Sequence, residues 1–391
     1  MPAVCLYFQV HQPFRLRKFS FFEAGSGADY FDHSLDELVM KRAAERCYLP
    51  ANQVLLDQVS RLGGSMKVAF SITGTAIEQM RLYAPEALDS FKALAETGHV
   101  EFLGETYFHS LASLFSLPEF RRQVELHRAL IEAEFRQAPR VFRNTELLSS
   151  EEIAREAKSM GFSALVAEGA EQVLGWRSPN GVFESADAKL PLILRNYRLS
   201  DDIAFRFSSG DGPGRPLTAA SFARRLSMLP PDTDSVGLFV DYETFGEHYA
   251  SNSTVLTFLA ELPEALLAQS GWSFVRPSEL ATRSVRRDTL PLSSVSSWAD
   301  EAKDASAWTG NSLQQSCLAR LYALEPKVLV AGDEGLLEAW RRLQTSDHFY
   351  YMSTKSGGDG SVHSYFSPFG SPYEAFIAFM NVVRDLEQKL G

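Results

Sequence analysis

Polar residues that could do chemistry directly follow short apolar runs of this sequence. Glu146 ends the stretch Phe142–Glu146, and Asp241 follows the run Val236–Val240. Ionisable groups at the ends of buried strands are costly unless they are paired, hydrogen-bonded or used in a reaction. Two such carboxylates on different strands suit glycoside hydrolysis, in which one is nucleophile or base and the other donates a proton. We therefore predict that Glu146 and Asp241 are the catalytic pair.

Other polar residues at the same strand ends are candidates for substrate binding. His11 and Gln12 follow the first apolar run, His109 follows the third, and Arg143 lies three residues before Glu146. We expect these four side chains to bind hydroxyl groups of the substrate. Glu243 is two residues after Asp241, so it shares a face with it if the strand continues. It is expected to orient Asp241 or to bind sugar, unless it forms a salt bridge with Arg143 or another base.

Three tryptophans and one C-terminal pair complete the candidate site. Trp176, Trp298 and Trp308 offer flat aromatic faces on which sugars can stack, although core packing explains each of them equally well. Trp176 is the one we assign to substrate binding. Asp347 and His348 lie in a stretch of otherwise helical periodicity, where they are expected to close the cleft.

Other chemistries fit the sequence less well. There is no HExxH or HxxxH pair, and His109 and His248 stand alone in their segments, which disfavours a zinc hydrolase. No GxSxG elbow, GxGxxG motif or Walker A loop is present. We therefore expect neither metal nor cofactor. His33, His99 and His127 fall on predicted helices or turns, and we interpret them as surface or core residues.

The elements that must position these residues alternate between strands and helices. Short apolar runs predict buried strands at Val4–Val10, Val68–Ile72, Val100–Leu103, Val141–Phe142, Ala164–Val166, Leu192–Leu194 and Val236–Val240. Amphipathic stretches between them predict helices at Pro85–Glu96, Pro118–Arg136 and Ser150–Met160. Such repetition is typical of parallel strands with right-handed crossovers, in either a closed barrel or an open doubly wound sheet.

The pattern changes after residue 284. Ser284–Ser297 is polar, and helical periodicity follows at Ser306–Leu324, Gly335–Leu343 and Tyr373–Leu390. We predict a catalytic domain over residues 1–284 and a mostly helical region over residues 285–391 that completes the cleft. Two loops are also predicted, one at Ser208–Arg215 and one at Lys355–Val362.

At these clusters the sequence resembles glycoside hydrolase family 57, in its α-amylase-like branch. The ordered motifs are His11-Gln12-Pro13, Gly98–Glu101, Asn144–Leu147 and Asp241–Gly246, and the stretches Leu199–Phe207 and Leu343–Met352 are also similar to this branch. Together they cover nearly the whole chain. The resemblance implies an incomplete (β/α)7 barrel followed by a C-terminal helical bundle.

The resemblance also implies an activity. It suggests a retaining mechanism on α-1,4-glucans, with Glu146 as nucleophile and Asp241 as acid/base. A glycoside hydrolase of α-amylase type acting on α-glucans or maltooligosaccharides is the favoured interpretation. Three alternatives stay open: a 4-α-glucanotransferase using the same pair, a catalytically silent glucan-binding protein, and a metal-dependent carbohydrate deacetylase.

Composition limits the partners. The net charge of −11 and a pI of about 5.3 argue against nucleic acid or an anionic membrane as the main partner. Three cysteines in 391 residues suggest no disulfide framework and favour a reducing compartment. We see no secretory signal or apolar run long enough for a membrane span, so we expect a cytoplasmic protein. The oligomeric state is left open.

Overall fold

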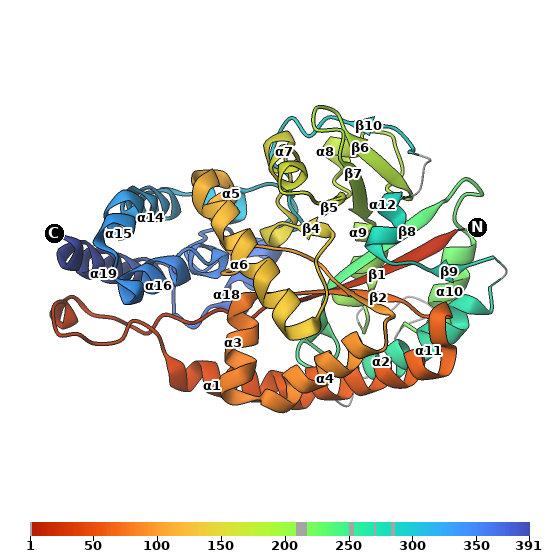
Figure 1. The fold of residues 1–391 in the computed structure, drawn as a ribbon, viewed down its shortest axis with the longest axis horizontal. Helices are drawn as coiled ribbons and strands as arrows, with labels where there is room; N and C mark the ends of the chain where they lie inside the picture. Colours follow the sequence, from red (N-terminus) through yellow and green to blue (C-terminus); the bar gives the residue numbers. More distant parts are fainter. Residues whose placement is uncertain (1, 209–216, 250–253, 270, 283–285) are drawn as a thin grey trace.

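The protein has a mixed α/β fold built around a mainly parallel sheet (Figure 1). The computed structural model describes residues 2–208, 217–249, 254–269, 271–282 and 286–391. The predicted loop Ser208–Arg215 lies, apart from Ser208, outside the described residues. The strands are β1 Ala3–Val10, β2 Val68–Ile72, β3 Val100–Phe102, β4 Val141–Arg143, β5 Ala164–Glu168, β6 Val182–Ser185, β7 Pro191–Arg195, β8 Ser235–Asp241, β9 Ser273–Phe274 and β10 Thr289–Leu290.

All seven predicted strands are confirmed, as β1 to β5, β7 and β8. They pair in parallel: β1 lies between β2 and β8, β2 pairs with β3, β4 with β5, β5 with β7, and β7 with β8. An isolated parallel bridge between Gly104 and Phe142 links the end of β3 to β4. Three elements were not predicted: β6, which is antiparallel to β7, and the two-residue strands β9 and β10.

The helices of the first part of the chain cover this sheet. They are α1 His33–Ala43, α2 Leu49–Leu62, α3 Gly74–Tyr83, α4 Pro85–Glu96, α5 Ala112–Phe115, α6 Leu117–Phe135, α7 Glu151–Ser159, α8 Glu171–Leu174, α9 Tyr197–Ala204, α10 Ala219–Ser227, α11 Val255–Leu267 and α12 Pro277–Thr282. Their ends follow ordinary capping rules. In α7, for example, the Ser150 side chain accepts from the Ile153 N–H, and Glu151 and Glu152 occupy the first turn.

The last hundred residues are mostly helical and gather on the left of Figure 1. They form α13 Ser306–Thr309, α14 Ser312–Ala323, α15 Glu325–Ala331, α16 Glu334–Arg342, α17 Ser346–Tyr350, α18 Gly357–Phe366 and α19 Pro372–Leu390. The predicted loop at Lys355–Val362 is wrong, because α18 begins at Gly357. Its glycines are typical of a loop, but His363 of this helix is buried and bonded to the Tyr350 carbonyl and to Asp300.

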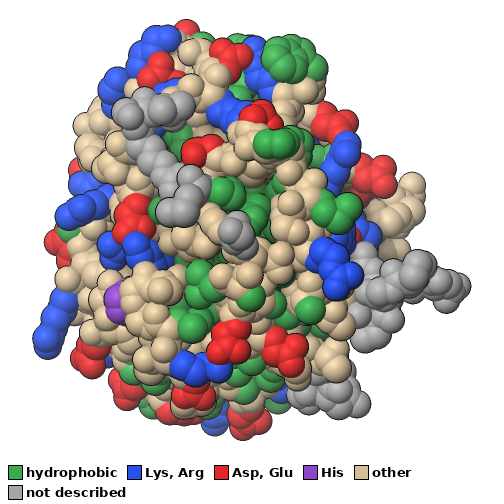
Figure 2. All heavy atoms as spheres, turned by 90° about the vertical axis from the view of Figure 1, so that its right-hand side faces the viewer, with side chains coloured by type: hydrophobic (Ala, Val, Ile, Leu, Met, Phe, Trp, Pro, Cys, Tyr) green, Lys and Arg blue, Asp and Glu red, His purple; other side chains and the backbone are tan. Residues whose placement is uncertain are grey.

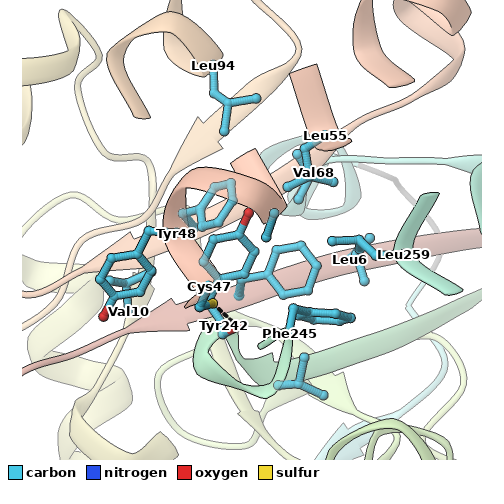
Figure 3. Close-up of a cluster of buried hydrophobic side chains, with 14 of the residues drawn as sticks. Leu6, Val10, Cys47, Tyr48, Leu55, Val68, Leu94, Tyr242, Phe245 and Leu259 are labelled. Carbon is cyan, nitrogen blue, oxygen red and sulfur yellow. Dashed lines mark hydrogen bonds between the residues drawn. The ribbon is translucent and has the colours of Figure 1, made fainter. Parts of the chain in front are cut away.

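Large apolar side chains fill the space between the sheet and the helices. Figure 3 shows one part of this core, to which Leu6 and Val10 of β1, Leu55 of α2 and Tyr242 after β8 contribute. Within it, the Cys47 thiol donates to the Tyr242 carbonyl at 3.0 Å. Cys5, Cys47 and Cys317 are buried and form no disulfide, as the sequence predicted.

The surface carries charges of both signs. Figure 2 shows the face on the side of α10 and α11, where acidic and basic side chains are interspersed with small apolar groups. Of the helices in the described ranges, none combines the length and apolar character that crossing a membrane requires.

Candidate active site

A cavity of about 800 Å³ opens at the carboxyl ends of β1 and β8. Seven of the predicted site residues line it: His11, Gln12, His109, Glu146, Asp241, Glu243 and Asp347. Most of these residues lie at the end of a buried strand or a few residues after it. Clefts at the carboxyl ends of parallel strands are the usual place for a site in this kind of fold.

Glu146 lies in a short turn, η4 Thr145–Leu147, directly after β4. Its backbone is left-handed, with φ of 55°, and that of Leu147 is also left-handed, with φ of 51°. Residues other than glycine adopt this conformation at a cost, and they often do so at functional sites. The turn aims the carboxylate into the cavity, where its two oxygens are bound by different partners.

His109 and Trp298 are those partners. His109 Nε2 lies 2.9 Å from Glu146 Oε1, and the Trp298 indole N–H donates to Oε2 at 2.6 Å. Burial alone would raise the pKa of Glu146, but the hydrogen bond and charge of His109, with help from Arg143 and Trp298, lower it below its usual value. Glu146 is therefore ionised over the physiological pH range.

His109 is itself held as a cation by two carboxylates. Its Nδ1 lies 3.4 Å from Glu105 Oε2, opposite the bond to Glu146. Burial opposes its charge, but the bonds to Glu105 and Glu146 prevail and raise the pKa of His109 to about 9. Like Glu146, it has a left-handed backbone, with φ of 50°.

Asp241 has the opposite environment. It ends β8, paired in register with Gln9 of β1, and faces the cavity. Burial, together with the negative charge of Glu146, raises its pKa to about 6, although Arg143 and Arg195 act against this shift. One carboxylate is thus held ionised while the other retains a proton up to mildly acidic pH.

Arg143 lies behind these groups rather than in the cavity wall. Its side chain is fully buried, its Nη1 is 3.6 Å from Glu105 Oε2, and its guanidinium lies 5.0 Å from the centre of the Trp298 ring. The prediction that Arg143 binds substrate hydroxyls directly is therefore wrong for this geometry. Its positive charge lowers the pKa of both carboxyl groups instead.

Glu243 faces the cavity beside Asp241. It accepts a hydrogen bond from the Tyr48 hydroxyl, which in turn accepts one from Gln12 Nε2 at 3.4 Å. Burial and the charge of Asp241 raise the pKa of Glu243 to about 8. The expected salt bridge to Arg143 is not formed, because Arg143 pairs with Glu105.

The C-terminal helices supply the other side of the cavity. Asp347 of α17 pairs with His11 Nε2 at 2.9 Å, and the His11 ring stacks on that of His109 at 3.9 Å. Burial, the charge of His109 and the proximity of Asp347 compete at His11, and its pKa is lowered. Residues 336 positions apart thus meet at the cavity.

His348 does not share this position. Its side chain is buried with its ring 6.1 Å from that of Phe379, and it is absent from the cavity wall. Burial lowers its pKa to about 4. The structure does not bring His348 to the cleft that it was expected to close, because adjacent residues on a helix point about 100° apart and only Asp347 of the two lines the cavity.

The three tryptophans lie in three different settings. Trp176 is 89% exposed, lies against Arg177 and does not line the cavity, so its assignment to substrate binding in this cleft is wrong. Trp308 is core. Trp298, which the sequence left undecided, lines the cavity beside Glu146. Aromatic lining residues that the sequence did not single out are Tyr197, Phe205, Tyr350, Tyr351 and Phe366.

Within the described residues, no group of three or more His, Cys, Asp or Glu side chains is arranged to hold a metal ion. The site histidines are occupied otherwise, since His11 and His109 each bind a carboxylate through Nε2. The site is a cleft lined by two partly buried carboxyl groups, the pKa of Glu146 being lowered and that of Asp241 raised.

The chain belongs to glycosyl hydrolase family 57, whose sequence pattern it matches over residues 5–293. A protein of Methanocaldococcus jannaschii described as "Putative alpha-amylase" is 39% identical over 397 residues, which cover 97% of this chain and 83% of that protein. The family resemblance seen in the sequence motifs is thereby confirmed.

Solved structures share the fold at low identity. The 4-alpha-glucanotransferase of Thermococcus litoralis has a TM-score of 0.67 at 14% identity, over 89% of this chain and 55% of that one. The branching enzyme of Thermococcus kodakaraensis gives 0.67 at 13% identity, covering 93% and 87%. The alpha-amylase AmyC of Thermotoga maritima gives 0.65 at 12% identity, covering 100% and 93%. At these identities the likeness concerns the fold alone.

Proposed function

We propose that the protein is a retaining glycoside hydrolase that cleaves α-1,4-glucosidic bonds in α-glucans or maltooligosaccharides. The observation that carries the proposal is the opposite treatment of Glu146 and Asp241. One carboxylate is bound by cationic His109 and the Trp298 N–H, and the other is buried beside it with its pKa raised to about 6. Pairs of carboxyl groups whose environments separate their pKa values mark the nucleophile and the acid.

The reaction follows from these two states. The Glu146 carboxylate attacks the anomeric carbon, the bond to the leaving oxygen breaks, and Asp241 gives that oxygen its proton. A covalent glycosyl ester on Glu146 results. Water then attacks the same carbon while ionised Asp241 takes a proton from it, and Glu146 departs as a carboxylate. Both residues end as they began, and no cofactor enters the scheme.

We also propose that the parallel strands form an incomplete (β/α)7 barrel, with residues 1–284 as the catalytic domain and residues 285–391 as the region that completes the cleft. The pairings support this. β1, β2, β3, β4, β5, β7 and β8 make a continuous circuit when the bridge between Gly104 and Phe142 is included. Closure of this kind brings Glu146 and Asp241 to the same rim.

A sugar chain suits the cavity. Its volume of about 800 Å³ exceeds what one small sugar needs, and sites of this size commonly hold larger ligands. His11, Gln12 and Asp347 line the cavity with polar groups that can exchange partners with hydroxyls, and Tyr350 and Phe366 present apolar surface. The acidic net charge favours a neutral substrate over an anionic one.

The main competing function is transfer rather than hydrolysis, since both share the glycosyl ester on Glu146 and differ only in what attacks it. A silent glucan-binding protein and a metal-dependent deacetylase compete with it less well. Chromatography of the products from purified maltooligosaccharides separates these functions. We expect shorter chains. Redistributed chain lengths would mean a transferase, and unchanged chains would contradict both enzymatic activities on glucans.

The roles of the two carboxyls have their own test. In Asp241→Ala, an aryl α-maltoside with a good leaving group should still form the glycosyl ester, which accumulates because water lacks its base. Azide needs no base, so it should restore turnover and give the α-glycosyl azide. Glu146→Ala should be inactive without azide. If azide rescues Glu146→Ala to the β-azide while Asp241→Ala stays inactive with every leaving group, the roles are reversed.

A further inference from the structure

A short segment of the C-terminal region is hydrogen-bonded to the loop that carries Glu146. Ser149 and Ser296 exchange both backbone hydrogen bonds, at 2.9 and 3.0 Å, and their hydroxyls lie 2.9 Å apart. Both serines are buried. This antiparallel bridge joins two stretches separated by about 150 residues of sequence and fixes where the next residues of each stretch can lie.

Trp298, two residues beyond the bridge, binds Glu146 twice. Its backbone N–H donates to the Glu146 carbonyl at 3.2 Å, and its indole N–H donates to the Glu146 carboxylate at 2.6 Å. Glu146 is the residue whose backbone is left-handed, so a contact on its carbonyl and one on its carboxylate together restrain both ends of a strained residue.

The Trp298 ring is itself held in place. The guanidinium groups of Arg143 and Arg195 lie 5.0 and 5.6 Å from its centre, close enough for cation–π attraction. Arg195 is fixed in turn by Glu168 at 3.1 Å and by Asp201 at 2.6 Å. Because its N–H is hydrogen-bonded and two cations lie over its ring, the indole interacts with protein groups and has little free surface on which a sugar could stack.

We infer that Trp298 is a positioning residue that orients the Glu146 carboxylate for attack on the anomeric carbon. It does so through the indole N–H hydrogen bond, and the backbone bridge between Ser149 and Ser296 holds it in place. The inference rests on the proposed function and deepens it. It assigns a role in orienting the nucleophile to a residue that lies outside the matched family region, residues 5–293. It distinguishes positioning from the sugar-platform role that the sequence had left open for Trp298.

Removing the N–H has consequences that simple packing would not have. The donor favours the ionised form of Glu146, so its loss should raise the pKa of that carboxyl. The same bond fixes one oxygen, so its loss should slow attack on the anomeric carbon more than it weakens binding. A charge-assisted hydrogen bond of this kind corresponds to a rate loss of roughly 10- to 100-fold.

The experiment compares Trp298→Phe, which keeps an aromatic ring, with Trp272→Phe, a partly buried tryptophan that packs against the core away from the cavity. For Trp298→Phe we expect kcat on maltooligosaccharides to fall about 10- to 100-fold with KM within about twofold. The acid limb of kcat/KM should move to higher pH. Trp272→Phe should match the parent. A raised KM with unchanged kcat and an unmoved acid limb would identify a sugar platform and overturn the inference.

A second measurement does not depend on activity or on how well Trp298→Phe folds. Indole emission from the parent should change as the pH falls through the lowered pKa of Glu146, below the usual range of a glutamate, and this change should be absent in Glu146→Gln. Equal pH responses in the two proteins would overturn the contact and with it the inference. If the parent turns over no glucan, the proposed function is wrong, and the role of Trp298 in catalysis is wrong with it. A difference in emission between the parent and Glu146→Gln would still verify the hydrogen bond from Trp298 to Glu146.

Discussion

Two carboxyl groups face the same cavity, and their immediate neighbours decide which one carries a proton. Glu146 has a cation and two N–H or O–H donors around its oxygens, including Ser346 at 3.4 Å. Asp241 has the charge of Glu146 and a buried position instead. The difference is made by His109 and Trp298, neither of which is adjacent to Glu146 in sequence. Residue type alone therefore does not assign the roles.

The first prediction is the pH profile. In the proposed mechanism, activity needs ionised Glu146 and protonated Asp241. The pKa of Asp241 is raised to about 6, so kcat/KM should fall about tenfold per pH unit above that value. The pKa of Glu146 is lowered, so the acid limb should lie below the usual range of a glutamate. His109, with a pKa of about 9, stays cationic in between.

The measurement is kcat/KM from about pH 3 to 9 on a maltooligosaccharide, a range that spans both limbs. Asp241→Ala assayed for ester formation with an activated aryl glycoside should lose the alkaline limb, because no proton is then required. An alkaline limb that persists unchanged in this variant would assign it to a group other than Asp241.

The second prediction concerns Glu243. Its pKa in the folded protein, about 8, is above the unfolded value, so the folded state loses stability as pH rises from about 4.5 through 8. Glu243→Gln keeps an acceptor for Tyr48 and removes that loss. We expect the variant to match the parent near pH 4.5 and to be more stable above pH 8, by roughly 2–5 kcal/mol.

Thermal unfolding at several pH values tests this. Glu247→Gln is the matched control, since Glu247 pairs with Arg42 and does not line the cavity beside Asp241. A Glu243→Gln curve parallel to the parent at all pH values would show that Glu243 is ionised in the folded protein.

At the scale of elements, the sequence predicted what depends on local pattern. The seven apolar runs became strands because a short, continuously apolar stretch is buried on both faces of a sheet that helices cover. β6, β9 and β10 were missed, since their stability comes from pairing with β7, β1 and β6 rather than from their own few residues. α18 was missed because its glycines indicate a loop, whereas its burial of His363 is a tertiary contact.

The same limit explains the site. Glu146, Asp241, His11 and His109 could be found because they follow strands. The position of Trp298 at the site and the exposure of Trp176 could not be predicted. Sequence periodicity does not indicate which aromatic residue of a polar segment packs against a loop far away in sequence. The prediction for His348 fails for a related reason. A sequence motif indicates which segment lies near the site, but the position of a residue around its helix decides whether the side chain points into the cavity.

α18 supplies the third prediction. His363 of this helix is buried, with Nε2 3.0 Å from Asp300 Oδ1 and Nδ1 3.0 Å from the Tyr350 carbonyl, and its ring stacks on Tyr350 at 3.6 Å. Val362 and Phe366 of the same helix line the cavity. His363→Ala should therefore loosen α18, lower stability by about 1–3 kcal/mol and raise KM for long glucans.

Limited trypsin digestion measures the loosening directly, because Lys355 lies just before α18 and pairs with Asp300 at 2.7 Å. Cleavage there should be faster in His363→Ala than in the parent. His33→Ala is the control, since His33 is partly exposed and pairs with nearby Asp29, far from α18 in sequence. Equal cleavage rates would mean that His363 does not hold the helix.

At the scale of the whole molecule, the cavity joins parts far apart in sequence. Strand ends provide His11, Glu146 and Asp241, and the C-terminal helices provide Asp347, Tyr350 and Phe366 across from them. Glu119 and Arg341, a buried ion pair at 2.8 Å, and the antiparallel bridge from Ser110 to Thr345 tie the two parts together nearby. A ligand that fills the cavity must contact both parts.

The last prediction follows from that arrangement. A maltooligosaccharide bound to inactive Glu146→Gln should stabilise the whole chain by mass action, by about 2.7 kcal/mol at a ligand concentration about 100 times Kd. Calorimetry should show the melting temperature rising with ligand concentration, with the strand region and the C-terminal helices unfolding together. In the double variant Glu146→Gln/Asp347→Asn, the group that the C-terminal helix presents beside His11 is weakened, so the same concentration should give a smaller shift. Glu146→Gln/Glu387→Gln is the matched control, because Glu387 pairs with Arg320 and does not line the cavity. A full ligand shift in the Asp347 variant would mean that the sugar binds the strand ends alone, and that the C-terminal helices support the cleft without touching what it holds.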